Sequence, residues 1–119
     1  MTGYRNLEVW KRAKLLAIAV YEMTRTDEIK LDFGLVDQMR RASVSIASNI
    51  AEGDERDTVK DTIRFLYIAK ASAAELFTQI EIAEVVYSLS LTETSHLKSE
   101  CDEIAKMLRG LIKYRTTQL

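Results

Sequence analysis

Residues 65–87 read FLYIAKASAAELFTQIEIAEVVY and carry the longest unbroken helical pattern in the chain. Apolar side chains recur there at alternating steps of three and four, which places them on one face of a helix. They are Leu66, Ala69, Ala73, Leu76, Ile80, Ala83 and Tyr87. The pattern predicts a helix over about residues 58–89, roughly 45 Å long. Such a continuous seam packs along another helix at a shallow angle.

Two helical patterns precede this one. The first is expected over about residues 7–23 with Asn6 as its N-cap, because a short polar side chain can accept hydrogen bonds from the first turn. After a polar loop, the second is expected over about residues 35–52, and Gly53 stands where a glycine commonly ends a helix. The two apolar stripes are Trp10, Ala13, Ala17, Val20 and Tyr21, then Leu35, Met39, Ala42, Ile46 and Ile50.

A fourth pattern follows possible caps at residues 92–95 and continues to about residue 113. Its apolar seam is Leu97, Cys101, Ile104, Leu108 and Leu111. Proline is absent and there are only 4 glycines, so the residues that mark tight turns are scarce. Short connections between long helices make neighbours antiparallel. The sequence therefore predicts an all-α fold, an antiparallel up-down-up-down four-helix bundle.

Length and composition limit the possible functions. A chain of 119 residues is expected to form one domain, residues 1–119. A net charge of −1 and a pI of about 5.9 provide no general attraction to nucleic acid. No run of residues is apolar and long enough to span a membrane, and the N-terminus has no apolar signal core. We expect a soluble, cytoplasmic protein without a membrane partner.

The chain offers little for catalysis or metal binding. A single cysteine, Cys101, and a single histidine, His96, exclude an internal disulfide and cysteine-cluster or two-histidine metal sites. Cys101 falls on an apolar seam, and His96 belongs near a helix start. No serine has a histidine nearby in sequence, and neither a glycine-rich phosphate loop nor paired Glu-x-x-His signatures occur. We expect no enzymatic activity and no cofactor.

Polar residues share one seam of the second helix and interrupt a seam of the third. They are Gln38, Arg41, Ser45, Asn49 and Glu52, then Ser72, Glu75 and Gln79. Buried polar groups are costly unless they are paired. The pattern predicts a polar network that links these helices or links subunits, with Arg41 paired to Glu75 or Glu52, and that specifies assembly. A ligand pocket and a solvated surface are the alternatives.

Basic residues form a second candidate site. They are Lys11, Arg12 and Lys14 on the first helix, Arg40 on the second, and Lys106, Arg109 and Lys113 on the fourth. We expect cations of the first and fourth helices to meet on one outer surface, where they would bind RNA or DNA phosphates. A solvated face, with cations favoured near a helix C-terminus, is the alternative.

Four segments carry a resemblance to a known family. Residues 38–53, QMRRASVSIASNIAEG, resemble the signature of small four-helix bundle proteins encoded in intervening sequences of bacterial large-subunit ribosomal RNA genes. YRNLEVWKRA resembles that family's opening, FLYIAKASAAELFTQIEIA its third helix and KMLRGLIKY its end. Two positions depart from the pattern: Ala47 stands where the family often has proline, and Ala71-Ser72-Ala73 where it often has Gly-Ser-Leu.

The resemblance implies a non-enzymatic bundle that assembles into a homopentamer. A related accessory protein of diversity-generating retroelements is a basic pentamer that binds nucleic acid and a reverse transcriptase, which implies RNA, DNA or such a protein as partners. The matching positions are Gln38, Arg40, Arg41, Ser45, Asn49, Glu52, Gly53, Ser72, Glu75 and Gln79. We expect a homo-oligomer that associates with nucleic acid or a ribonucleoprotein. The alternative is a protein-interaction scaffold that binds no nucleic acid.

Overall fold

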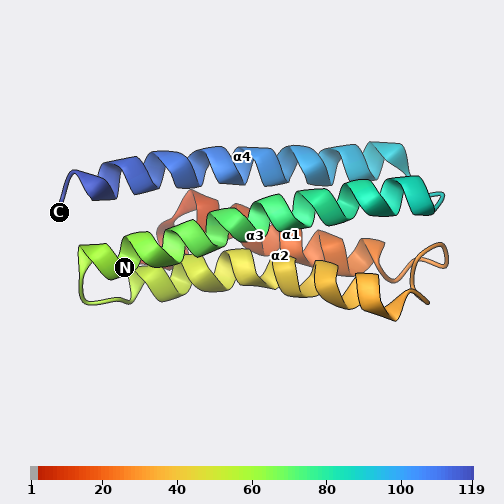
Figure 1. Ribbon diagram of the computed structural model, residues 1–119, viewed down its shortest axis with the longest axis horizontal. Helices are drawn as coiled ribbons and strands as arrows, with labels where there is room; N and C mark the ends of the chain where they lie inside the picture. The colour runs from red at the N-terminus through yellow and green to blue at the C-terminus, as the bar shows by residue number, and fades with distance from the viewer. Residues whose placement is uncertain (1–2) are drawn as a thin grey trace.

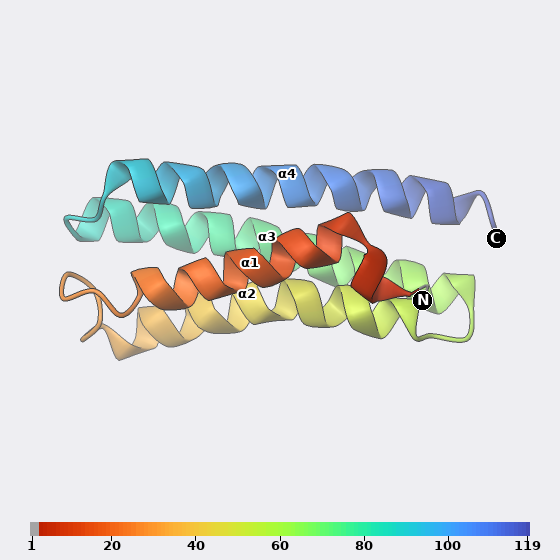
Figure 2. The same cartoon turned by 180° about the vertical axis from the view of Figure 1, so that it is seen from behind.

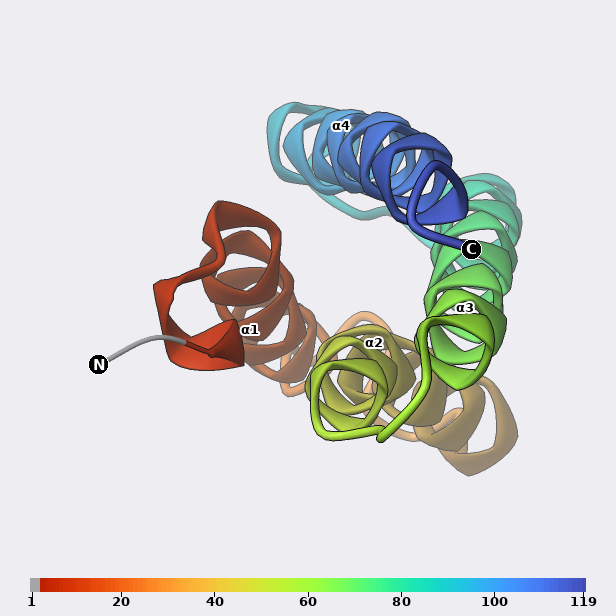
Figure 3. The ribbon, with the colours of Figure 1, turned by 90° about the vertical axis from the view of Figure 1, so that its left-hand side faces the viewer.

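The structure is a computed structural model that describes residues 3–119. After the 3₁₀ turn η1 (Tyr4–Asn6) come the helices α1 (Glu8–Met23), α2 (Phe33–Asp54), α3 (Val59–Val86) and α4 (Leu91–Thr116), and this part of the chain has no strand. The four helices run side by side along the long axis of a body of 47 × 23 × 19 Å (Figures 1 and 2). Seen end-on, they surround one interior in chain order (Figure 3). The predicted all-α four-helix bundle is confirmed.

A single apolar core runs the length of the bundle. The predicted seam of α3 is buried from Leu66 to Ala83, and that of α2 is buried from Met39 to Ile50. In α4 the buried seam ends on Ile112, whereas Leu111 is only half-buried. In α1 the core side chains are Val9, Ala13, Leu16, Val20 and Met23, while Trp10, Ala17 and Tyr21 are half-buried. Helix α1 is therefore rotated relative to the stripe expected from its sequence.

Three helix starts differ from prediction because other residues provide the caps. Asn6 belongs to η1, so Leu7 is the N-cap residue of α1 and makes no side-chain cap bond. Asp32 Oδ1 accepts a hydrogen bond from the Leu35 amide at 3.1 Å, and α2 therefore starts two residues early. Ser90 Oγ accepts from the Glu93 amide at 3.3 Å, so α4 begins at residue 91 and α3 ends at 86 rather than 89.

Gly53 does not follow the end of α2; it is the second-to-last residue of the helix and is buried. A Cβ at this position would be 3.1 Å from Phe65 Cβ and 3.2 Å from the carbonyl oxygen of Thr62. The Thr62 hydroxyl also donates to the Gly53 carbonyl at 2.8 Å. Glycine is therefore placed here because α2 and α3 approach closely, which is a property of the helix pair.

Candidate nucleic-acid interface

Helix α4 carries a row of exposed cations, as the sequence predicts. Lys106, Arg109 and Lys113 lie at steps of three and four, and each is exposed. Within residues 3–119, none of the three makes an ion pair with a carboxylate. Their charge is therefore available to an external anion.

Two members of this row, Arg109 and Lys113, border a groove between α3 and α4. Arg109, Lys113 and Ile112 come from α4, Tyr67 and Lys70 come from α3, and the groove has a volume of about 480 Å³. Thr116 and Thr117 also line it. The Lys70 ammonium lies 5.6 Å from the centroid of the Tyr67 ring. Among the described residues that line the groove there are three cations and no carboxylate.

Lys70 and Tyr67 were not among the residues selected from the sequence. Neither belongs to a basic run, and each stands beside the apolar seam of α3. Their place beside the α4 cations could be inferred only from the antiparallel register of α3 and α4, which brings the start of one helix to the end of the other. That register requires the position of the turn at residues 87–90, which the sequence placed too late.

The cations of α1 have different surroundings from those of the α4 row. Arg12 Nε donates to Glu100 Oε1 at 3.1 Å, and a second bond joins the same two side chains. The hydrogen bonds and the charge of Glu100 raise the pKa of the Arg12 guanidinium. Lys14 lies 4.9 Å from the Trp10 ring centroid, on the side of α1 that faces α2, and Lys11 is exposed. Arg12 therefore reaches α4 as part of an ion pair, and no α1 cation is among the described residues that line the groove beside the α4 row.

The Arg40 side chain is held by contacts within the bundle and is not a free cation at the surface. Its Nε donates to Thr24 Oγ1 at 2.9 Å, and its guanidinium carbon lies 4.5 Å from the centroid of the Tyr21 ring. Both contacts tie α2 to the end of α1. Stacking on an aromatic ring is typical of arginine in such positions. Arg40 is thereby separated from the α4 row.

The predicted polar network between α2 and α3 is present in part. The hydroxyls of Ser45 and Ser72 are 2.9 Å apart, and Asn49 Nδ2 donates to the carbonyl oxygen of Ser45 at 2.8 Å and to its hydroxyl at 2.9 Å. The bond between Ser45 and Ser72 joins the middles of the two helices, while the two Asn49 bonds lie within α2. Gln79 is buried, and its Oε1 has no hydrogen-bond partner within the described chain.

The charged members of that network do not pair as expected. Arg41 Nε donates to Asp37 Oδ2 at 2.9 Å on the exposed side of α2, one turn earlier in the same helix. Glu52 pairs with Arg56 at 3.0 Å, while Glu75 and Gln38 are exposed. Within the subunit, the pairing of Arg41 with Glu75 or Glu52 is wrong, because a carboxylate four residues away on the same helix is nearer.

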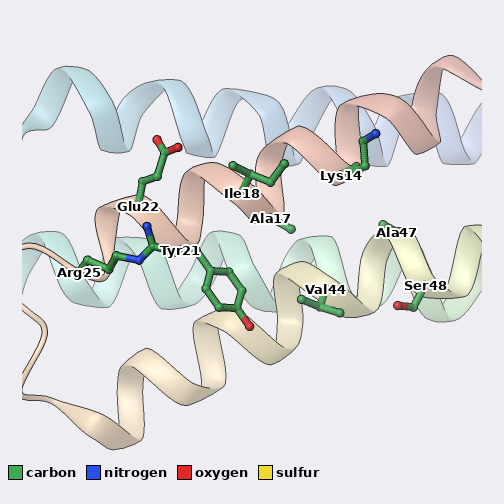
Figure 4. Close-up of a pocket in the computed structure, with 9 residues that line it drawn as sticks. All are labelled: Lys14, Ala17, Ile18, Tyr21, Glu22, Arg25, Val44, Ala47 and Ser48. Atoms are coloured by element: carbon green, nitrogen blue, oxygen red, sulfur yellow. The ribbon is translucent and has the colours of Figure 1, made fainter.

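A second groove lies between α1 and α2 and is mostly apolar. Ala17 and Ile18 of α1 and Val44 and Ala47 of α2 line it, with a volume of about 460 Å³ (Figure 4). Lys14, Glu22 and Arg25 lie at its edges on the α1 side (Figure 4). Ile18 is 49% exposed and Val44 is 42% exposed, so the bundle leaves this apolar surface uncovered.

Neither candidate catalytic side chain lies in a reactive setting. Cys101 is buried in the core, and burial raises the pKa of its thiol to about 12. His96 is exposed near the start of α4. The described residues contain no group of three or more histidine, cysteine, aspartate or glutamate side chains that could hold a metal ion. No helix in residues 3–119 is apolar and long enough to cross a membrane.

Comparison with known proteins adds a family and a fold. The model of the 23S rRNA-intervening sequence protein family matches residues 5–110. A crystal structure of a protein of unknown function from the S23 ribosomal protein family of Bacteroides thetaiotaomicron superposes with a TM-score of 0.81. The two sequences are 23% identical, and the match covers 88% of this chain and 98% of the other. Among curated proteins, none matches the sequence.

Proposed function

This chain belongs to the 23S rRNA-intervening sequence protein family, and from that premise we propose that it is a non-enzymatic homo-oligomer that associates with nucleic acid, as RNA or ribonucleoprotein, through a basic surface. The observation that carries the proposal is the α4 row of Lys106, Arg109 and Lys113, which is exposed and unpaired within the described chain. Nucleic-acid affinity is dominated by such contacts to phosphate.

The alternative of cations that only stabilise a helix end explains part of the row. The macrodipole favours cations within the last turn, where Lys113 and Arg115 lie. Arg109 is further from the end of α4, and Lys70 is in the interior of α3. Their side chains nevertheless border the same groove as Lys113. An external polyanion is the ligand that fits this gathering of charge.

Self-association is proposed on the apolar surface that the single bundle leaves open. On α3, Ile68, Ile82 and Val86 are 39%, 49% and 59% exposed. They lie on the same side of the helix as the buried Oε1 of Gln79, which has no hydrogen-bond partner among residues 3–119. The α1/α2 groove is a second apolar surface on other helices. Contact between two different surfaces is head-to-tail and closes into a ring when the rotation allows. A ring of five copies would repeat the basic row and strengthen weak contacts by avidity.

The nucleic-acid proposal is tested by fluorescence anisotropy of labelled structured RNA and duplex DNA at several salt concentrations. Binding should weaken steeply with salt, and the slope should count the phosphates contacted. The double variant Lys106→Glu with Arg109→Glu should lose binding while remaining folded. The matched control is Lys11→Glu with Lys14→Glu, which makes the same charge change on α1 and should bind like the wild type.

Two results would contradict this proposal. Retained binding in the α4 variant together with loss in the α1 control would move the interface to α1. Absence of binding at low salt by an intact oligomer would favour the protein-interaction scaffold.

Assembly is tested by light scattering of the purified protein. The proposal expects about five times the chain mass of 13.6 kDa. Arg41→Ala and Glu75→Ala test whether the polar residues of α2 and α3 link subunits, so each variant should reduce this mass. The thermal midpoint of the subunit should stay the same, because both side chains are exposed. A monomeric mass at all concentrations would overturn the homo-oligomer.

A further inference from the structure

We propose that the α3/α4 groove binds unpaired, single-stranded nucleic acid. Lys70, Arg109 and Lys113 would contact its phosphates, and a base would stack on Tyr67. This inference rests on the proposed association with nucleic acid. Beyond that function, it names the groove as the binding site and single-stranded nucleic acid as the ligand. It also adds stacking on Tyr67, which phosphate binding alone does not require.

Charge is distributed unevenly along the α3/α4 interface. At one end, Lys98 lies between Glu84 and Glu81, with Nζ to oxygen distances of 3.0 and 3.4 Å. The hydrogen bonds and charges of these carboxylates raise the pKa of the Lys98 ammonium. At the other end, three cations border one groove without a carboxylate among its described lining residues. The same helix pair therefore neutralises a cation internally at one end and leaves positive charge for an anion at the other.

The exposed ring of Tyr67 is the part of the groove that would favour single-stranded over double-stranded nucleic acid. Its side chain is 53% exposed, although it lies in the groove among the cations. An exposed aromatic ring beside unpaired cations is the combination by which proteins bind single strands, because each base presents a flat face for stacking. Bases in a duplex are already stacked and would leave Tyr67 without a partner. A duplex would therefore use only the cations.

The groove is suited to stacking more than to reading base identity. Its volume of about 480 Å³ lies within the usual range for small-ligand sites, roughly 300–1,000 Å³. The Thr116 hydroxyl donates to the Ile112 carbonyl at 2.8 Å, and the Thr117 hydroxyl donates to the Tyr114 carbonyl at 2.6 Å. Both hydroxyls can then only accept from a ligand. We expect a preference for single strands with little dependence on sequence.

The test measures binding of short labelled oligouridine and of a labelled blunt-ended RNA duplex without a loop to the full chain by fluorescence anisotropy. Tyr67→Leu keeps an apolar side chain but removes the ring, and Tyr67→Phe keeps the ring. Tyr114→Leu is the matched control, because Tyr114 is also exposed, at 60%, but does not line the groove. Oligothymidine in parallel distinguishes RNA from DNA as the source of the strand.

Tyr67→Leu should weaken oligouridine binding by roughly 5- to 150-fold, the loss of one base-stacking contact. Binding of the RNA duplex should change less than about twofold, and Tyr67→Phe and Tyr114→Leu should bind like the wild type. Wild-type affinity of Tyr67→Leu for oligouridine, or an equal loss for the RNA duplex, would overturn the single-strand site while leaving the proposed function intact. Absence of any nucleic-acid binding by the wild type at low salt would overturn both.

Discussion

The Tyr87 hydroxyl donates a hydrogen bond to Asp32 Oδ2 at 2.6 Å across 55 positions of the chain. Asp32 is also the N-cap of α2, where its other carboxylate oxygen accepts from the Leu35 amide. Together, the Tyr87 hydroxyl and this amide lower the pKa of Asp32, and the carboxylate raises the pKa of the Tyr87 phenol. One side chain therefore fixes both the start of α2 and the end of α3.

Tyr87→Phe should reduce the free energy of unfolding at neutral pH and leave the helices intact. The lowered pKa of Asp32 means that this contribution is present above its unfolded pKa of about 3.9 and is lost as pH falls through the folded value. The raised pKa of Tyr87 means that it is also lost as pH rises through the folded pKa of the phenol. Urea unfolding of both proteins across pH should show the difference narrowing at both extremes. A difference independent of pH would contradict this assignment.

Gly53→Ala should destabilise the protein by about 1–3 kcal/mol, because the added methyl group would contact Phe65 and the Thr62 backbone at 3.1 and 3.2 Å. Gly110→Ala is the matched control. Nothing lies within 4 Å of a Cβ at that position, and alanine inside a helix is favoured over glycine. The control should be more stable by about 0.5–1 kcal/mol. Urea unfolding measures the free energy of unfolding of both variants. If Gly53→Ala stabilised the protein as much as Gly110→Ala, α2 and α3 would have to be further apart at Gly53 than the structure places them.

The pair of Arg12 and Glu100 should contribute a coupling energy of about 0.5–1 kcal/mol between α1 and α4. The Arg12 and Glu100 side chains are 32% and 20% exposed, so solvent screens the interaction. The double-mutant cycle uses Arg12→Gln, Glu100→Gln and the combined variant. The coupling should shrink at high salt. A coupling of zero at low salt would show that the two helices are held by apolar contacts alone.

Cys101 should resist alkylation by iodoacetamide at pH 8 in the folded protein and react readily in urea. The thiolate is the reactive form, and burial raises the pKa of this thiol to about 12. The slow reaction of the folded protein should follow opening of the bundle, so it should accelerate in destabilised variants such as Gly53→Ala. Mass spectrometry measures the added mass over time. Equal rates in buffer and in urea would place Cys101 at the surface.

The fold followed from the sequence because its apolar seams are long and continuous. Leu66 to Ala83 of α3 and Met39 to Ile50 of α2 are buried as the spacing predicts. Helix ends were less predictable, since several residues near each end can serve as caps. Asp32 and Ser90 cap earlier than expected. The role of Gly53 does not follow from its own helix, because it depends on the close approach of Phe65 and Thr62 of α3.

The candidate site was predictable only where one helix defines it. The steps between Lys106, Arg109 and Lys113 place them together without reference to other helices. Arg12 was misplaced because its partner Glu100 belongs to a helix 88 positions away. The partner of Arg41 could have been predicted, because Asp37 lies four residues before it on the same helix, where opposite charges commonly pair.

The order of the helices around the interior also determines how fast the subunit forms. Each helix contacts the next one in the chain, and among the described helices α1 and α4 are the pair that meets without being neighbours in sequence (Figure 3). Helical bundles with such local connections fold within microseconds to milliseconds. Encounters between proteins at micromolar concentration take roughly 0.1–10 s. Chains of this topology therefore complete their folding before they meet, and any ring they form is built from finished subunits.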